Sequence, residues 1–137
     1  MSRVQLGLNV TDIDAAVAFY ERAFGVPAAK RRPGYANFEI AEPPLKLVLF
    51  EGDAGGTINH LGVEVGDTDE VHGATRHLRS VGLETRIEDG VDCCHAIQDK
   101  VWVSDPDGLE WEWYTVLADS PGTTSEGCCT AAEPACC

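Results

Sequence analysis

An internal repeat constrains this chain more than any other feature of its sequence. The segment Gln5 to Asp14, QLGLNVTDID, aligns without gaps with the segment His60 to Asp69, HLGVEVGDTD, and five of the ten positions are identical. Each segment alternates apolar and polar residues, as a half-buried strand does, and then places Asp residues where a helix begins. The chain is therefore expected to contain two copies of one supersecondary unit.

Both copies continue with the same order of elements. A helix is expected after each repeat strand, with Asp12 and Asp67 near the two helix starts, where their side chains can cap free amides. The strands expected after the helices are Ala36–Ile40, Lys46–Phe50, Thr85–Ile87, Lys100–Val103 and Trp111–Val116. The sequence thus predicts an α+β chain of two tandem βαβββ units, residues 1–52 and 57–117, joined by a glycine-rich segment.

The two units are expected to form a single domain over residues 1–117. The remaining residues, 118–137, are small and polar and carry no aromatic or branched apolar anchor. Such a segment buries too little surface to offset the entropy of ordering it, so we expect a flexible, cysteine-rich tail.

Charge and hydropathy exclude two classes of partner. The 137 residues carry a formal net charge of −13, whereas nucleic-acid binding depends on clustered Lys and Arg. No apolar run approaches the roughly 20 residues that a membrane-spanning helix needs. The first ten residues contain no apolar signal core, so a cytoplasmic protein is expected.

The six cysteines all occur as adjacent pairs: Cys93-Cys94, Cys128-Cys129 and Cys136-Cys137. Adjacent cysteines close almost no loop, and a disulfide between them is strained, so a disulfide framework is not indicated. The pattern favours reduced dithiols that bind a soft metal or metalloid. The role of the two tail pairs is left open by the sequence.

The paired units and one local motif resemble the vicinal oxygen chelate superfamily, which includes glyoxalase I, bleomycin resistance proteins and extradiol dioxygenases. The motif is Asp105-Pro106-Asp107-Gly108, followed four positions later by the carboxylate of Glu112. The resemblance implies a curved mixed sheet that forms a cup around a metal ion. By position it implies Gln5, His60 and Glu112 as the metal ligands, which would act in catalysis through the bound metal.

The chemistry of these residues agrees with that implication. Gln5 and His60 occupy equivalent positions in the two repeats, so a pseudo-twofold axis would bring them face to face. Glu110 lies on the same strand face as Glu112 and is an alternative ligand, although the spacing from the turn favours Glu112. Leu49, the first-unit equivalent of Glu112, cannot bind metal, so three protein ligands would leave positions open for substrate and O2.

Cys93 and Cys94 indicate one branch of the superfamily. They lie in VDCCHAIQDKVW (Val91 to Trp102), which we expect to include a loop over the metal. With Lys30 to Leu49 and Asn59 to Val65, this segment resembles the organoarsenical carbon–arsenic lyases, which are close to cadmium-induced proteins. The resemblance implies an Fe(II)- and O2-dependent enzyme that demethylates or dearylates trivalent organoarsenicals, with Cys93 and Cys94 binding the substrate.

Other interpretations stay open from the sequence. Because Gln5 replaces a histidine of the usual iron triad, Ni or Co is also expected in isolated samples. A protein that sequesters cadmium or arsenic without turnover explains the dithiols, whereas a glyoxalase-type isomerase leaves Cys93 and Cys94 without a role. His95 and Lys100 are expected to be exposed residues, with a role beside the thiols as the alternative. A monomer or a homodimer is compatible with the repeat.

Overall fold

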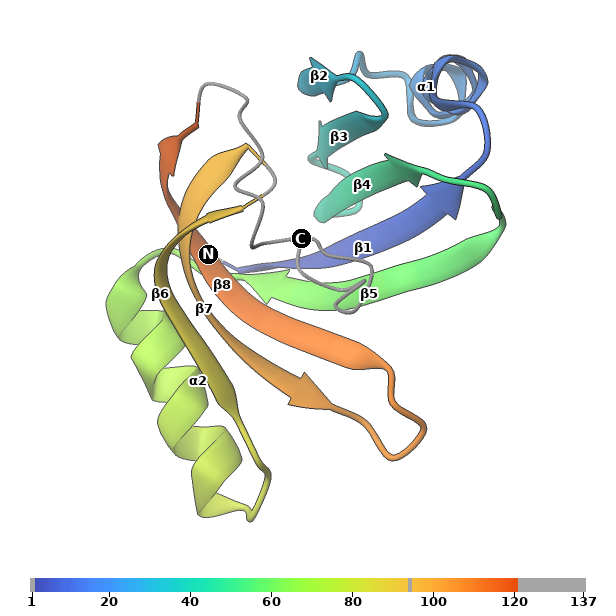
Figure 1. Ribbon diagram of the computed structural model, residues 1–137. Helices are drawn as coiled ribbons and strands as arrows, with labels where there is room; N and C mark the ends of the chain where they lie inside the picture. Colours follow the sequence, from blue (N-terminus) through green and yellow to red (C-terminus); the bar gives the residue numbers. More distant parts are fainter. Residues whose placement is uncertain (1, 94, 121–137) are drawn as a thin grey trace. The chain divides into compact units, whose positions relative to one another are not determined.

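The computed structural model describes residues 2–93 and 95–120 of the chain (Figure 1). The helices are α1 (Ile13–Phe24) and α2 (Thr68–Ser80). The strands are β1 (Arg3–Val10), β2 (Lys30–Arg32), β3 (Tyr35–Ile40), β4 (Leu45–Glu51), β5 (Thr57–Glu64), β6 (Arg86–Cys93), β7 (Ala96–Ser104) and β8 (Glu110–Asp119). The predicted βαβββ order is confirmed in both repeats. Neither described helix is long and apolar enough to span a bilayer.

The chain divides into two compact units, which we call the N-terminal unit (Arg3–Leu61) and the C-terminal unit, which begins at Gly62. The boundary falls inside β5 and not in the glycine-rich segment before it. The physical reason is that the first half of β5 is tied to β1, for example through a hydrogen bond of 2.9 Å between the side chains of Asn9 and Thr57.

In the N-terminal unit the strand order is β2-β3-β4-β1-β5. Strands β1 and β4 are parallel, with Gln5 opposite Lys46, while β3 pairs with both β2 and β4 in the antiparallel sense. A parallel pair needs a long crossover, and here α1, β2 and β3 lie between β1 and β4 in the chain. Residues on β1 consequently alternate between a face that packs on α1 and the opposite face.

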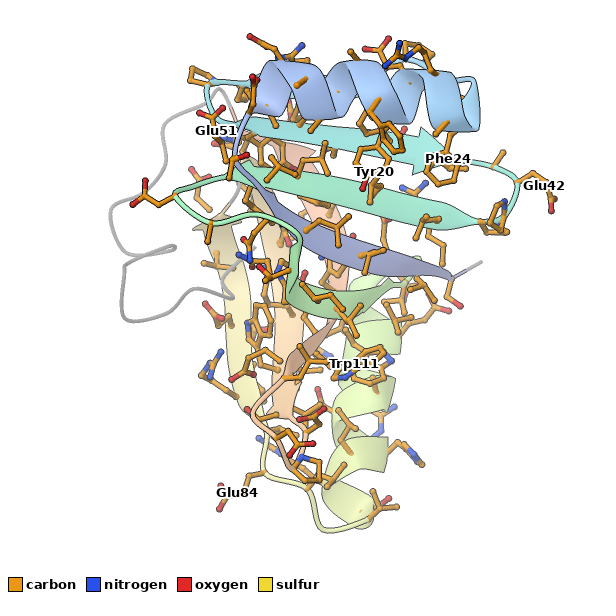
Figure 2. The ribbon with its side chains drawn as sticks, turned by 90° about the vertical axis from the view of Figure 1, so that its right-hand side faces the viewer. Tyr20, Phe24, Glu42, Glu51, Glu84 and Trp111 are labelled. Carbon is orange, nitrogen blue, oxygen red and sulfur yellow. The ribbon has the colours of Figure 1, made fainter. Side chains whose placement is uncertain are left out.

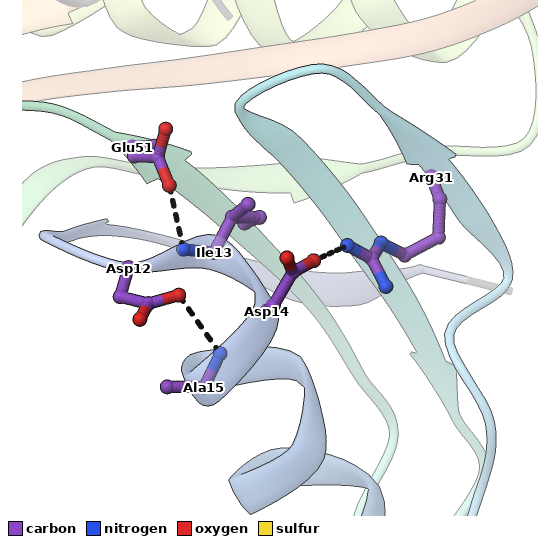
Figure 3. A network of polar contacts seen from close by, with 6 residues as sticks. All are labelled: Asp12, Ile13, Asp14, Ala15, Arg31 and Glu51. Atoms are coloured by element: carbon purple, nitrogen blue, oxygen red, sulfur yellow. Dashed lines mark hydrogen bonds and ion pairs between the residues drawn. The ribbon is translucent and has the colours of Figure 1, made fainter.

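Side chains fix both the start and the position of α1 (Figure 3). Asp12 is the N-cap, and its Oδ1 accepts a hydrogen bond of 3.1 Å from the backbone N–H of Ala15. Glu51 at the end of β4 accepts from the backbone N–H of Ile13 at 2.8 Å. These two carboxylates satisfy free amides at the positive end of the helix and so tie it to the sheet.

The core of the N-terminal unit lies between α1 and the sheet. Its fully buried members are Ile13, Val17, Ala36, Phe38, Ile40, Leu47 and Leu49. Tyr20 and Phe24 extend from α1 toward the strands, and the Tyr20 ring meets the Phe38 ring edge-on at a centroid distance of 6.4 Å (Figure 2). Apolar packing therefore occupies the α1 face of the sheet, whereas the opposite face carries the buried polar residues Gln5 and Asn37 beside buried Val48.

The C-terminal unit repeats this plan, with the strand order β5-β8-β7-β6 and α2 packed along β7 and β8. Asp67 caps α2 through a hydrogen bond of 2.9 Å from the backbone N–H of Glu70, as the sequence predicted. Val71 and Leu78 of α2 pack on Val101 of β7. Again one sheet face is apolar and covered by a helix.

Three expectations about strands need correction. The segment from Val91 to Trp102 is largely strand and not a loop, because β6 and β7 form a long antiparallel hairpin that runs to the pair Cys93–Ala96. A bulge between Glu88 and Val91, with Gly90 at φ 62°, accommodates the polar residues that made this stretch resemble a loop. Strand β2 supplies the remaining strand of the first βαβββ unit, for which no residues were predicted, and β8 is longer than predicted at both ends.

The buried α1 face predicts a large difference between two phenylalanines of the N-terminal unit. Phe38→Ala should lower the free energy of unfolding by about 3–5 kcal/mol, because it removes a fully buried ring and leaves a cavity. Phe19→Ala, at a ring that is 55% exposed on α1, is the matched control and should change it by less than about 1 kcal/mol. Urea unfolding followed by circular dichroism measures both, and equal losses would contradict this packing.

Candidate functional site

The face of the N-terminal sheet that turns away from α1 carries a buried polar pair. Gln5 on β1 is 2% exposed, and His60 on β5 is fully buried. Their Nε2 atoms lie 2.8 Å apart, which is hydrogen-bonding distance. The predicted contact between these two repeat-equivalent residues is thus present within the N-terminal unit.

Gly7 provides the space that the His60 ring occupies. A Cβ atom on Gly7 would lie 3.1 Å from Nδ1 of His60 and 3.2 Å from its Cε1, which is closer than side-chain packing normally allows. Gly7 lies two positions after Gln5 on β1 and therefore projects to the same sheet face. The Phe50 ring, on β4, lies against the imidazole with a centroid distance of 5.9 Å. The ring is thus held between a glycine backbone and an aromatic side chain.

The other nitrogen of His60 is bound by its neighbour in sequence. Nδ1 lies 2.8 Å from Oδ1 of Asn59, and Nδ2 of Asn59 donates to Oδ1 of Asn9 at 2.9 Å. Asn9 in turn donates to the hydroxyl of Thr57 at 2.9 Å. A row of polar side chains from β1 and β5 therefore leads from Thr57 to the imidazole.

The third expected ligand, Glu112, lies on β8 in the C-terminal unit and is fully buried. Its Oε2 is 3.0 Å from Nζ of Lys100 on β7, which is also fully buried. The expectation that Lys100 is an exposed strand-end residue is therefore wrong. A buried carboxylate needs a compensating positive charge, and Lys100 supplies it in this unit.

Aromatic rings complete the surroundings of this charge pair. Lys100 Nζ lies 5.4 Å from the centroid of the Trp102 ring and 5.9 Å from that of Tyr114. In the β7–β8 ladder Lys100 pairs with Tyr114 and Trp102 pairs with Glu112, so all four side chains project from one sheet face. The alternative ligand Glu110 accepts a hydrogen bond from the Ser104 hydroxyl at 2.8 Å and is less buried than Glu112.

Of the two expected substrate-binding cysteines, Cys93 is the last residue of β6. Cys94 lies outside the described residues, as do the tail cysteines. His95, expected to be exposed, is only 7% exposed and has a φ of 68°. Its backbone oxygen accepts from Ser120 N–H at 2.9 Å, which attaches the turn to the residue after β8 and explains the burial.

The residues present fit a metal ion by their donor chemistry. An imidazole nitrogen and an amide oxygen are both suitable metal ligands, and the two side chains approach to 2.8 Å between their Nε2 atoms. Within residues 2–93 and 95–120, no three His, Cys, Asp or Glu side chains form a metal-binding group. The expected ligands Gln5, His60 and Glu112 do not meet this definition, because Gln5 contributes an amide.

Three residues around the expected ligands were not assigned a role from the sequence, namely Gly7, Asn9 and Asn59, and Lys100 was expected to be exposed. Gly7 did carry a signal, since a glycine stands at the equivalent position of the second repeat. Asn9 and Asn59 carried none, because an isolated Asn in a strand has many possible partners. The burial of Lys100 depends on its ion pair with Glu112, which forms only when β7 and β8 lie side by side in the folded protein.

Comparisons with known proteins agree with the fold and the motifs. The model of the glyoxalase/bleomycin resistance protein/dioxygenase superfamily matches residues 3–113. The chain is 61% identical to the cadmium-induced protein CadI of Mycobacterium tuberculosis, over 88% of this chain and 80% of CadI. It is 51% identical to a trivalent organoarsenical cleaving enzyme of Thermomonospora curvata, over 95% of this chain and 89% of that enzyme.

Solved structures confirm the predicted fold class, the vicinal oxygen chelate fold. The Mn(II)-bound glyoxalase of Novosphingobium aromaticivorans matches 93% of this chain with a TM-score of 0.63 and 21% identity, and the match spans 44% of the glyoxalase. Homoprotocatechuate 2,3-dioxygenase of Arthrobacter globiformis matches 85% of this chain with a TM-score of 0.60 and 20% identity, spanning 35% of that enzyme.

The close approach at Gly7 predicts a specific defect. Gly7→Ala should lower the free energy of unfolding by about 1–3 kcal/mol and shift the NMR signals of the His60 ring, because the new methyl group displaces the imidazole. Gly52→Ala is the control, since a Cβ there meets no atom within 4 Å, and it should change the free energy by about 0.5 kcal/mol or less. An unshifted His60 ring in Gly7→Ala would show that the glycine does not position it.

Proposed function

Because the chain belongs to the glyoxalase/bleomycin resistance protein/dioxygenase superfamily, we propose that it is an Fe(II)- and O2-dependent lyase that cleaves the carbon–arsenic bond of trivalent organoarsenicals. The observation that carries the proposal is the similarity, over 95% of the chain, to an enzyme named for cleaving these compounds. A probable trivalent organoarsenical cleaving enzyme of Bacillus subtilis is 37% identical to the chain, and a trivalent organoarsenical cleaving enzyme of Bacillus sp. is 35% identical. The adjacent cysteines Cys93 and Cys94 in the sequence support the same substrate class, since arsenic(III) is a soft thiophile.

Gln5, His60 and Glu112 are the proposed iron ligands. When bound, the iron supplies the activation of O2, which the protein side chains cannot perform themselves. The burial of each of the three side chains supports this assignment, because a dry environment favours charge-neutralising contacts with a cation. Three protein ligands leave further positions of a six-coordinate ion open.

Lys100 has a defined part in this scheme. It balances the carboxylate charge of Glu112 through the 3.0 Å contact, which also restricts where Oε2 of Glu112 can lie. The flanking Trp102 and Tyr114 rings restrict where the ammonium group can move. Lys100 is thus a positioning residue for Glu112.

Substrate capture is assigned to the β6–β7 turn. Two thiols of Cys93 and Cys94 condense with a trivalent arsenical, RAs(OH)2, forming two As–S bonds and releasing two waters. The turn connects two long strands, and the backbone contact between His95 and Ser120 anchors it.

The overall reaction balances with O2 as the only oxidant. For methylarsonous acid, CH3As(OH)2 and O2 give As(OH)3 and formaldehyde. The C–As bond breaks, the carbon is oxidised to the level of an aldehyde, and arsenic stays trivalent. We propose that the reaction occurs in the cytoplasm, where thiols remain reduced.

Oxygen dependence is the direct test of this chemistry. Iron-loaded protein should convert methylarsonous acid to arsenite and formaldehyde in air, and the rate should fall by about 100-fold or more without O2, because the oxidant is missing. Arsenic speciation by liquid chromatography and mass spectrometry measures the product. Equal conversion under strict anaerobic conditions would overturn an O2-dependent mechanism.

A single substitution separates turnover from sequestration. Glu112→Gln preserves the size of the side chain and a hydrogen-bond acceptor for Lys100 but removes the carboxylate. A lyase should lose its activity in this variant while arsenic still binds to the thiols. If the wild type shows no turnover and the variant protects cells from arsenic as well as the wild type does, the protein sequesters arsenic and is not a lyase.

The thiol pair gives an independent prediction. Cys93→Ser and Cys94→Ser should each lower kcat/KM for methylarsonous acid by about 100-fold or more, because two-point capture becomes one-point capture. The iron content should stay at the wild-type level. Cys128→Ser is the control outside the proposed site and should keep at least about half the wild-type activity. Near-normal kcat/KM in either single variant would refute capture by two thiolates.

A further inference from the structure

We propose that Asn59 is a positioning residue that fixes the tautomer and orientation of His60, acting through a hydrogen-bonded chain that runs from Thr57 to the imidazole. The chain consists of Thr57, Asn9, Asn59, His60 and Gln5, all within the N-terminal unit. The consequence for metal binding rests on the proposed function, whereas the tautomer is a property of the metal-free protein and is measurable by itself.

The nitrogen and the oxygen of the Asn59 side-chain amide have different partners. Nδ2 of Asn59 donates to Oδ1 of Asn9 at 2.9 Å, so the amide is turned with its oxygen toward His60. That oxygen lies 2.8 Å from Nδ1 of the imidazole. An amide oxygen only accepts hydrogen bonds, and therefore Nδ1 carries the proton in this arrangement.

The tautomer determines what the opposite ring nitrogen can do. A neutral imidazole has one N–H, so a proton on Nδ1 leaves Nε2 with a free lone pair. In the metal-free protein this lone pair accepts from Nε2 of Gln5 at 2.8 Å. A metal ion uses the same lone pair, so the chain holds His60 in the form that can coordinate a metal through Nε2.

Asn9 and Thr57 continue the chain beyond Asn59. Asn9 accepts the Asn59 hydrogen bond on its Oδ1 and donates from its own Nδ2 to Oγ1 of Thr57. At the other end the Gln5 amide presents its donor Nε2 to the imidazole, whereas at this end the Thr57 hydroxyl can either accept or donate. If it donated instead, every amide would be reversed and the proton would move to Nε2, where it blocks metal binding.

Packing around His60 disfavours rotation of its ring. The Gly7 backbone lies against one part of the imidazole, and the Phe50 ring lies 5.9 Å away by centroid distance. Rotation by half a turn would put Cδ2 where Nδ1 lies and Cε1 where Nε2 lies, so both nitrogens would lose their partners Asn59 and Gln5. Buried polar atoms without partners cost about 1–3 kcal/mol each, so the present orientation is favoured.

The experiment measures the tautomer and the metal affinity separately. Metal-free protein with 15N-labelled histidine is examined by long-range 1H–15N NMR, and the His60 signal is assigned from its loss in His60→Gln. The proposal expects His60 as the Nδ1–H tautomer in the wild type and a mixture or the Nε2–H form in Asn59→Leu. Affinity for Co(II) alone, measured by competition with a chelator, should fall by about 10–100-fold in Asn59→Leu.

Matched variants separate positioning from general damage. Asn59→Asp keeps an oxygen that accepts from Nδ1 and should restore the Nδ1–H tautomer with Co(II) affinity within about threefold of the wild type. Thr57→Val changes only the exposed end of the chain and should have a smaller effect than Asn59→Leu. If Asn59→Leu does not fold, Asn9→Leu serves as the second variant, since it removes the acceptor that orients Asn59.

The outcomes separate this inference from the proposed function. An Nε2–H tautomer in the wild type, or unchanged tautomer and Co(II) affinity in folded Asn59→Leu, overturns the positioning role. If the tautomer responds to Asn59 but wild-type protein neither binds Fe(II) nor cleaves methylarsonous acid, the tautomer control stands and the proposed function fails.

Discussion

A buried imidazole beside a buried amide persists only when each polar atom has a partner, and the Gln5–His60 contact meets this condition in the N-terminal unit. Several neighbouring features follow from it. Gly7 must lack a side chain because the ring occupies that space, and Asn59 must offer an oxygen to the other ring nitrogen. The apolar core under α1 holds β1 in place and leaves this polar face undisturbed.

In the C-terminal unit, buried polar side chains find their partners through opposite charges. Lys100 and Glu112 are both fully buried and 3.0 Å apart, and removal of either partner would leave an uncompensated charge in a dry environment. Such a pair stabilises a fold less than apolar residues of similar size would, so its presence favours a functional explanation. In both units, then, stability comes from the helix-covered face and the opposite face is available for chemistry.

Much of this plan was predictable from the sequence. The repeat gave both helix starts, and Asp12 and Asp67 do cap α1 and α2. It also predicted the Gln5–His60 contact, because equivalent positions of a repeat are related by symmetry. The length of the β6–β7 hairpin was not predictable, since its polar residues are typical of loops and are accommodated by a bulge at Gly90. The burial of Lys100 was missed because it depends on a partner twelve residues away.

The central claim is that one iron ion is held by Gln5, His60 and Glu112. Diffraction data collected on either side of the iron absorption edge, from crystals grown with Fe(II) without oxygen, test it most directly. The account predicts one anomalous peak about 2.0–2.2 Å from a Gln5 amide oxygen, His60 Nε2 and a Glu112 carboxylate oxygen. An iron peak bound elsewhere, or one that lacks His60 as a ligand, would contradict the account.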